Sequence, residues 1–366
     1  MRSARPAGGG GTAVERAAQS VLSSFSSSTV LKAREVASLW AGYGTITEVR
    51  TDDKQQPALI IKHVAPPPGS GVSHQRKLQS YIIEAAFYQR VVPHLPRTGS
   101  PCCHVPECVG VHSSLDAAAD QEAGEVHLVM GDLRSRFPSQ CSGLDEQQAK
   151  AALLWLAAFH AACWGADAQG LGLWRDGCYW HLETRLEELE DIGHDWRQLK
   201  AAAHEVDRRL RDTPFRTLTH GDFKTANLLF GSGGGSNGGL ECAAYDFQYV
   251  GGGTGLKDVV YLFVSGLSGR VLQQQEEALL RFYHTQLLEG LRATALSGDS
   301  GSGTSIADPT AVAAAIEQYT FEAMMGDYKL ALVDYVRFMA GWGFWGQSKW
   351  AATKARQFMI ELGLDT

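Results

Sequence analysis

Two short apolar runs with a polar centre between them, at residues 218–230, constrain this chain more than any other stretch. The sequence Leu-Thr-His-Gly-Asp-Phe-Lys-Thr-Ala-Asn-Leu-Leu-Phe predicts a strand, a tight loop and a second strand. The loop carries Asp222, with Lys224 two residues later and Asn227 five residues later. A further apolar strand is predicted to end at Asp246. We therefore expect two loops that together display two carboxylates, a cation and an amide.

Phosphoryl transfer needs such a set of side chains. One carboxylate accepts the proton of the attacking hydroxyl, one cation offsets the phosphate charge, and one amide oxygen binds a metal. Mg²⁺ prefers oxygen ligands from one or two carboxylates plus phosphates and water, so Asp246 suits the main metal carboxylate. The alternative is a hairpin whose polar residues only cap turns, and the agreement of several fixed positions in order argues against it.

The motif His-Gly-Asp-x-x-x-x-Asn, followed by Asp-Phe-Gln, resembles the catalytic and metal loops of the aminoglycoside phosphotransferase and choline kinase superfamily, which are relatives of protein kinases. The Gln after Asp-Phe and the Leu-Ala-Ala-Phe-His-Ala-Ala-Cys-Trp stretch at residues 156–164 are most similar to the ecdysteroid-kinase-like (CHK kinase-like) branch. The resemblance implies an α+β, two-lobed protein-kinase-like fold, with a small β-rich N-lobe and a larger, mostly helical C-lobe.

The resemblance also implies roles for the loop residues. Asp222 would orient or deprotonate the substrate hydroxyl, and Asn227 and Asp246 would bind Mg²⁺. Lys224 departs from the branch named above, where an aromatic residue is common, and matches the Lys of protein-kinase catalytic loops that contacts the γ-phosphate. We expect His220 to fix the loop rather than to transfer protons. A Gly-rich segment follows without an Ala-Pro-Glu motif, which argues against a protein-kinase role.

Upstream of the loop, Gly42 and Gly44 lie in a turn that feeds a strand, where backbone N–H groups can approach ATP phosphates. Only two glycines are present, so an ordinary hairpin turn is an open alternative. Lys62 lies inside the apolar strand predicted at residues 57–64, where a Lys usually extends its ammonium group outward. The resemblance makes Lys62 the nucleotide Lys, paired with Glu84 of the next helix as in kinases.

Two further assignments come from position and pattern. The segment around Met130 and Gly131 would be the hinge whose backbone hydrogen-bonds adenine, as the resemblance implies. The clearest helix, residues 144–164, contains His160, for which we expect a hydrogen-bonded core position. In related folds an Asp at the position of Asp258 anchors the catalytic loop backbone.

We expect a flexible leader at residues 1–29, a kinase-like N-lobe at 30–131 and a kinase-like C-lobe at 132–366. The first 30 residues are rich in Arg, Ala, Gly and Ser, with one acid, a composition shared with plastid and mitochondrial transit peptides. Because their Arg content is low for a transit peptide, we favour a floppy leader running into a short amphipathic helix near residues 13–25. The expected location is cytoplasmic, with plastid or mitochondrial import as the alternative.

Composition excludes several classes of partner. The 33 Lys and Arg residues against 40 Asp and Glu residues give a net charge of −7 without a basic run, which argues against nucleic acid. No stretch approaches the roughly 20 apolar residues that span a bilayer, so we expect no stable membrane insertion. Seven cysteines without metal-type spacing predict reduced thiols in an intracellular protein. The sequence leaves protein partners unknown.

The predicted function is ATP- and Mg²⁺-dependent transfer of the γ-phosphoryl group to a hydroxyl of a small-molecule alcohol. The acceptor stays open between a hydrophobic, sterol-like alcohol, choline or ethanolamine, and an aminoglycoside-like polyol. An aromatic C-terminal third, residues 319–350, and an acidic run at residues 183–191 are the candidate substrate surfaces. A second alternative is a catalytically weak nucleotide-binding scaffold (pseudokinase), which should have lost a motif residue, whereas this chain has lost none.

Overall fold

The computed structural model describes residues 11–96, 102–116, 124–233, 239–298 and 305–365. The chain divides into two compact units, which we call the N-unit (residues 1–85 and 106–132) and the C-unit (residues 86–105 and 133–366). The N-unit is built on a five-stranded antiparallel sheet, and the C-unit is mostly helical. The predicted fold class is confirmed.

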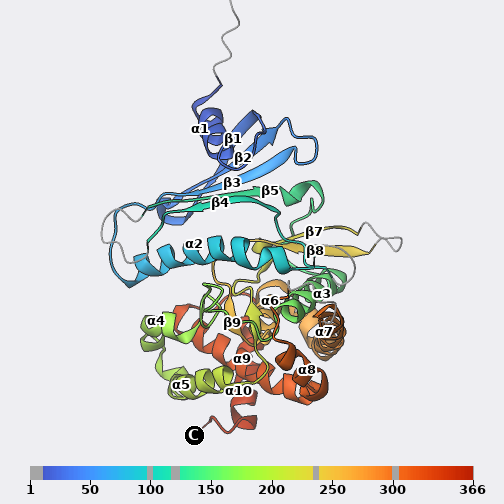
Figure 1. Cartoon of the computed structure of the whole chain (residues 1–366). Coiled ribbons are helices and arrows are strands. Elements are labelled where there is room, and N and C mark those ends of the chain that lie inside the picture. The colour runs from blue at the N-terminus through green and yellow to red at the C-terminus, as the bar shows by residue number, and fades with distance from the viewer. Residues whose placement is uncertain (1–10, 97–101, 117–123, 234–238, 299–304, 366) are drawn as a thin grey trace, which may run out of the picture. The chain divides into compact units, whose positions relative to one another are not determined.

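The sheet of the N-unit has the strand order β1-β2-β3-β5-β4, and every neighbouring pair is antiparallel (Figure 1). Its strands and helices are β1 (Val30–Ser38), β2 (Gly44–Thr51), β3 (Ala58–Val64), β4 (Cys108–Ser113), β5 (Val126–Gly131), α1 (Ala13–Leu22) and α2 (Val72–Arg90), and the division between the units falls within α2.

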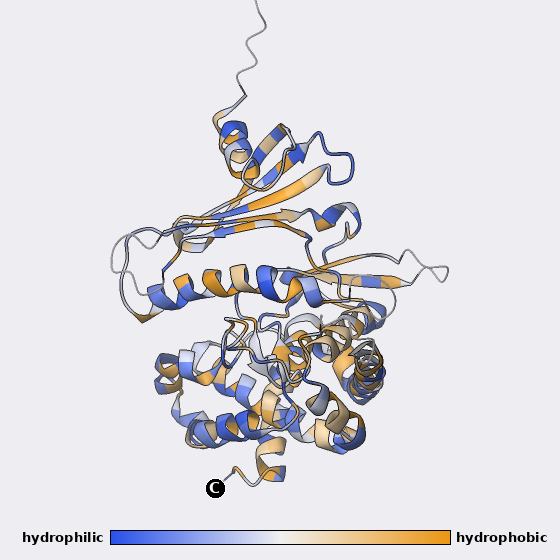
Figure 2. Cartoon of the chain, viewed as in Figure 1, coloured by the Kyte–Doolittle hydropathy of each residue, from blue (hydrophilic) through white to orange (hydrophobic). Residues whose placement is uncertain are grey.

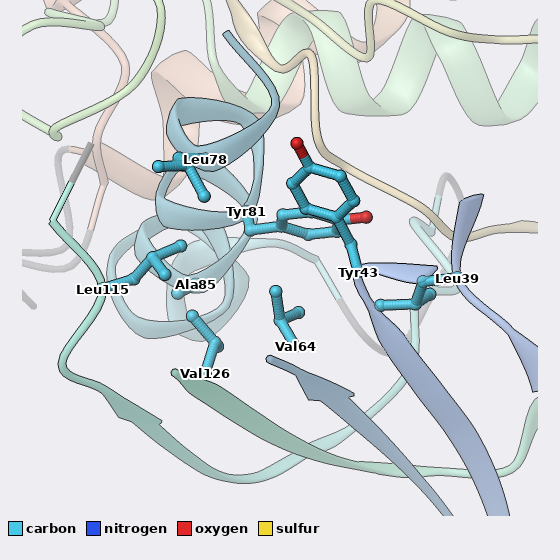
Figure 3. Close-up of a cluster of buried hydrophobic side chains, with 8 residues drawn as sticks. All are labelled: Leu39, Tyr43, Val64, Leu78, Tyr81, Ala85, Leu115 and Val126. Carbon is cyan, nitrogen blue, oxygen red and sulfur yellow. The ribbon is translucent and has the colours of Figure 1, made fainter. Parts of the chain in front are cut away.

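Both faces of this sheet are covered by apolar contacts, because side chains alternate along each strand. On one face, Val64 and Val126 pack with Leu78, Tyr81 and Ala85 of α2, as Figure 3 shows. On the other face, a second cluster joins the sheet to α1; its buried members are Ala18, Leu22, Val49, Leu59, Ile61 and Val129. The sheet is therefore a packed layer between two helices.

Helix α1 lies inside the segment that we expected to be a flexible leader. Its first turn has a capping box, in which the Thr12 hydroxyl accepts from the N–H of Glu15 and the Glu15 carboxylate accepts from the N–H of Thr12. Ala18 and Leu22 are buried against the sheet. The predicted short helix is present at residues 13–22, where its apolar face packs against the sheet.

The C-unit contains two small antiparallel ribbons, β6 with β9 and β7 with β8. Its elements are α3 (Glu146–Ala162), α4 (Leu186–Glu190), α5 (Arg197–Asp212), β6 (Thr217–Thr219), β7 (Leu228–Ser232), β8 (Leu240–Ala244), β9 (Gly251–Gly253), α6 (Leu256–Gly266), α7 (Gly269–Gly298), α8 (Pro309–Gln318), α9 (Phe321–Trp342) and α10 (Ser348–Glu361).

Hydropathy explains the layering of the C-unit helices. Helix α9 is buried almost continuously between Leu330 and Met339, as expected for a helix that is apolar on most sides. Helix α5 is amphipathic and mostly hydrophilic in Figure 2, with Leu199, Val206 and Leu210 among its buried positions. Helix α3 confirms the helix predicted at residues 144–164.

The ribbons confirm the predicted strand, loop and strand. Strand β6 leads into the loop, and β7 leaves it and pairs with β8. The Gly/Ser-rich residues 234–238 and 299–304 lie outside the described residues. All seven cysteines are described, and none forms a disulfide. In the part of the chain that the structure describes, no helix is long and apolar enough to cross a membrane.

Candidate active site

The loop between β6 and β7, residues 220–227, is called the catalytic loop below. Two side chains of this loop, those of Lys224 and Asn227, contact the carboxylate of Asp222. Oδ2 of Asp222 accepts from Nζ of Lys224 at 2.9 Å and from Nδ2 of Asn227 at 3.0 Å, and Nδ2 also donates to the backbone carbonyl of Asp222 at 2.9 Å. Oδ1 is buried and has no hydrogen-bond partner among the described residues. One oxygen of the carboxylate is therefore fixed, and the other is left for a ligand.

The surroundings of Asp222 change its acidity. Burial raises the pKa of this carboxyl to about 6, the charge of Lys224 opposes that rise, and the charge of Asp246 adds to it. A general base works best when its pKa lies near the working pH. Asp222 is therefore ionised at neutral pH and still basic enough to take a proton.

His220 joins the catalytic loop to the end of β8. The N–H of Asp222 donates to Nδ1 at 3.3 Å, and Nε2 donates to the carbonyl of Tyr245 at 3.1 Å, which assigns the Nε2–H tautomer. Burial lowers the pKa of His220, in keeping with a neutral ring. The geometry fits the expectation that His220 fixes the loop.

Asp258, near the start of α6, holds the other side of the loop. Its Oδ2 accepts from the N–H of His220 at 2.7 Å, and its Oδ1 accepts from the N–H of Gly221 at 2.9 Å. His160 of α3 contacts Oδ2 of Asp258 through Nε2 at 3.2 Å and the hydroxyl of Tyr283 through Nδ1 at 2.8 Å. The predicted anchoring by Asp258 and the core position of His160 are confirmed. The link from Tyr283 of α7 was not apparent from the sequence.

A backbone hydrogen bond joins Asn227 to the residue before Asp246, where the loop reaches the second ribbon. The N–H of Tyr245 donates to the backbone carbonyl of Asn227 at 3.1 Å, and Asp246 is the next residue after Tyr245. Asp246 has a φ of 69°, a left-handed conformation that a non-glycine residue adopts at an energetic cost and that is common at functional sites. Because the amide nitrogen of Asn227 is bonded to Asp222, its oxygen is the atom available to a cation. Two oxygen donors of this kind fit Mg²⁺.

In the N-unit, Lys62 and Glu84 form a buried ion pair. Nζ of Lys62 lies 2.6 Å from Oε2 of Glu84, and the two side chains are 8% and 4% exposed. Both lie on the α2 face of the sheet, where Lys62 also approaches the ring of Tyr81, with 5.5 Å from Nζ to the centroid. The predicted pairing is present in the structure, and the nucleotide role stays a prediction.

The turn between β1 and β2 requires its glycines. Gly42 and Gly44 have φ values of 77° and 144°, in the range that favours glycine. A Cβ on Gly44 would lie 2.0 Å from the backbone oxygen of His63. The turn is thus closely fitted to β3, which an ordinary hairpin would also explain.

Met130 and Gly131 end β5. The N–H of Gly131 already donates to the carbonyl of Glu107 at 2.8 Å, and the N–H of Asp132 donates to the carbonyl of Ala58 at 3.1 Å. Adenine recognition through the Gly131 N–H would require the first of these bonds to open. The assignment of this segment to adenine stays a prediction.

A cluster of aromatic rings around Arg185 was missed from the sequence. The Arg185 guanidinium carbon lies 5.1, 5.7 and 5.4 Å from the ring centroids of Tyr179, Phe338 and Trp342. Nε donates to the carbonyl of Tyr179 at 2.7 Å, and the N–H of Tyr179 donates to the carbonyl of Gly221 in the catalytic loop at 3.0 Å. We call these four side chains the Arg185 cluster.

In the two predicted substrate surfaces, many side chains are buried or form ion pairs with other residues of this chain. Of the C-terminal aromatic residues, Tyr319, Tyr328, Tyr335 and Phe338 are buried, whereas Trp342 and Phe344 are exposed. In the acidic run, Glu183 pairs with Arg175 and Arg211, and Glu188 pairs with Arg185. This acidic run is therefore partly neutralised by arginines.

The chain matches the Ecdysteroid kinase-like family over residues 43–169 and 178–296. These segments cover more than half of the chain and include the catalytic loop, Asp246, Lys62 and Glu84. The chain belongs to this family. The predicted ecdysteroid-kinase-like branch is thereby confirmed, and membership of this family supports a kinase-like phosphotransferase. No curated protein sequence matches the chain.

Three solved structures illustrate the likeness. A GDP complex of aminoglycoside 2'-phosphotransferase-IIIa is 10% identical, with a TM-score of 0.46 and coverage of 96% of this chain and 100% of that chain. A choline kinase from Streptococcus pneumoniae is 13% identical, with a TM-score of 0.46 and coverage of 96% and 99%. An amicoumacin kinase in complex with AMP-PNP and Ca²⁺ is 16% identical, with a TM-score of 0.44 and coverage of 94% and 92%. The family assignment rests on the family match alone.

Proposed function

We propose that this chain transfers the γ-phosphoryl group of ATP, in the presence of Mg²⁺, to a hydroxyl group of a small-molecule alcohol. The observation that carries the proposal is that the two carboxylate oxygens of Asp222 have different surroundings. Its Oδ2 accepts from Lys224 and Asn227, while its buried Oδ1 has no partner among the described residues. Burial raises the pKa of the carboxyl group to about 6. A base with one oriented, unengaged oxygen suits a hydroxyl acceptor.

In the proposed step, the acceptor hydroxyl donates to Oδ1 of Asp222, and its oxygen forms a bond to the γ-phosphorus. The bond from that phosphorus to the β–γ bridging oxygen breaks, and ADP leaves with those electrons. The proton moves to Oδ1 and is later released to water. Lys224 offsets negative charge beside the reacting oxygen and keeps the Asp222 carboxylate oriented.

The remaining residues would hold the nucleotide and its metal ion. Asn227 and Asp246 supply the oxygen ligands for Mg²⁺, which when bound neutralises charge on the phosphates. Lys62, oriented by Glu84, would contact the α- and β-phosphates. The turn at Gly42 and Gly44 would approach the phosphates with backbone N–H groups, and the backbone at Met130 and Gly131 would contact adenine.

For the acceptor, we propose a neutral and largely apolar alcohol, of which a sterol-like compound is an example. A quaternary ammonium group such as that of choline is bound by open aromatic faces. In the Arg185 cluster such faces are already covered by the chain's own guanidinium group. An aminoglycoside needs unpaired acids, and Glu183 and Glu188 are paired with arginines.

The test is acceptor-dependent ADP release by the full chain with Mg²⁺ and ATP, against a panel of neutral alcohols, choline, ethanolamine and aminoglycosides. Asp222→Asn should abolish the acceptor-dependent part. Asp327→Asn is a matched control, since Asp327 is also a buried C-unit carboxyl whose pKa burial raises to about 6. ATP binding with acceptor-independent hydrolysis in both variants would favour the pseudokinase scaffold instead.

A further inference from the structure

Three histidines lie side by side on three neighbouring strands of the N-unit sheet. In the strand register, His63 of β3 is opposite His127 of β5, and His127 is opposite His112 of β4. The chain neighbours of His63 and His127 are Val64 and Val126, which point into the α2-side cluster in Figure 3. Because side chains alternate along a strand, the histidines lie on the opposite face, which carries α1.

A carboxylate completes this group. Oε2 of Glu125 lies 3.1 Å from Nε2 of His63, and Oε1 lies 3.8 Å from Nδ1 of His127. The rings of His63 and His127 stack with centroids 4.3 Å apart, and one potential ligand atom from each of the three residues lies within 4.8 Å of the others. The side chains of His63, Glu125 and His127 are 37%, 45% and 15% exposed, so a solute can reach them.

We propose that His63, Glu125 and His127 form a binding site for a transition-metal dication, with Zn²⁺ as the best match. Two imidazole nitrogens and one carboxylate oxygen are ligands that Zn²⁺ takes in tetrahedral sites. Metal–ligand distances near 2.0 Å place tetrahedral ligand atoms about 3.3 Å apart, so the present atoms, which lie within 4.8 Å of one another, draw together by up to about 1.5 Å. The more exposed side chains, His63 and Glu125, make such a change by turning about χ1 and χ2. Water or the neighbouring His112 takes the fourth position.

The ion-pair partners of Glu125 among the described residues are histidines, His63 at 3.1 Å and His127 at 3.8 Å. A metal ion bound by these three side chains would therefore displace no Lys or Arg from the carboxylate in the part of the chain that the structure describes.

A second group of similar composition serves as a contrast. Asp176, His181 and Glu183 also lie close together in the C-unit. Their carboxylates are already paired with arginines, namely Arg175, Arg211 and Arg216. A dication there would compete with fixed positive charges, and we assign no metal to this group.

The proposed metal site is separate from the proposed phosphotransfer chemistry. Lys62, the chain neighbour of His63, turns to the α2 face and pairs with Glu84, whereas the metal ligands lie on the α1 face. On that face the apolar cluster includes Leu59, Ile61 and Val129, and the pair of Ile61 and Val129 is followed, at the next position on the same face, by the pair of His63 and His127. A bound ion would cross-link β3 and β5 where apolar packing stops, and so stabilise the N-unit sheet.

The test is calorimetric titration of Zn²⁺ into the full chain after removal of metals with EDTA, compared with His127→Gln, Glu125→Gln and the control His204→Gln on an exposed turn of α5. We expect one equivalent of Zn²⁺ to bind to the parent chain and to the control. Affinity should fall at least about tenfold in both ligand variants. Circular dichroism establishes that each variant is folded.

Titration with Co²⁺ separates this site from the cysteines. A His/carboxylate site gives visible d–d absorption without the near-ultraviolet thiolate charge-transfer band, and the d–d absorption should be lost in His127→Gln. Three results would overturn the proposal: no stoichiometric Zn²⁺ binding, unchanged affinity in folded His127→Gln, or a thiolate band that accounts for the bound ion.

Discussion

His160 and Asp258 meet in the core of the C-unit, with Nε2 of the imidazole 3.2 Å from Oδ2 of the carboxylate and both side chains fully buried. The same carboxylate accepts two backbone N–H groups of the catalytic loop. The position of Asp222 thus depends on a chain of contacts that begins at Tyr283 of α7 and passes through α3. This relationship makes His160 a positioning residue.

Replacement of His160 should therefore lower turnover without changing nucleotide affinity. In His160→Ala, Asp258 loses one partner and the loop backbone becomes less constrained, so we expect kcat to fall about tenfold or more while KM for ATP changes little. Loss of a buried hydrogen bond should also cost about 1–3 kcal/mol of unfolding free energy. His160→Gln, which can still donate to Asp258, should recover part of kcat. Equal losses in both variants would contradict the positioning role.

Asp222→Asn should separate activity from stability. The variant removes the proposed base, so we expect kcat to fall by about 10²–10⁴-fold. The folded-state pKa of about 6 lies above the ordinary value, so the fold disfavours the ionised form of Asp222. This group therefore lowers stability progressively as pH rises through that window, and above pH 6 the full penalty is present. Urea unfolding at pH 8 should find the variant as stable as the parent chain or more stable.

Lys224→Met should move the pH dependence of turnover. The positive charge of Lys224 holds the pKa of Asp222 below the value that burial alone would give. We expect kcat/KM of the parent chain to rise with pH around a midpoint near 6 and then level off. In Lys224→Met, the midpoint should shift to higher pH because the carboxyl loses its cationic partner. A profile with reduced amplitude and an unchanged midpoint would contradict this coupling.

Local sequence patterns predicted much of the site, because the residues concerned are close along the chain. Asp222, Lys224 and Asn227 lie within one loop, and the spacing of polar and apolar residues predicts the strands that flank it. Resemblance to known kinases added the more distant pair of Lys62 and Glu84. The residues of these contacts can be recognised from the sequence alone, because they match a known motif.

Contacts that depend on tertiary packing could not be predicted in this way. The link between His160 and Tyr283 depends on how α3 and α7 pack, and the Arg185 cluster joins an irregular segment to α9. The histidine row depends on the strand order β3-β5-β4, in which β5 follows β4 in the chain but lies next to β3. The alternation of side chains indicates which residues share a face, whereas the register that aligns them comes only from the assembled sheet. The burial of α1 likewise depends on the sheet that receives it.

The buried ion pair of the N-unit supports a prediction that combines stability and binding. In Glu84→Gln, Lys62 keeps its charge in a buried position without its 2.6 Å carboxylate partner, so unfolding free energy should fall by about 3–5 kcal/mol. In Lys62→Met/Glu84→Gln, no unpaired charge remains, and much of that stability should return. Nucleotide affinity should be lost in both variants, because one misplaces the ammonium group and the other removes it. Urea unfolding and ATP titration measure the two effects separately, with exposed Lys54→Met as the control. A double variant that regains stability yet binds ATP like the parent chain would leave the ion pair with a purely structural role.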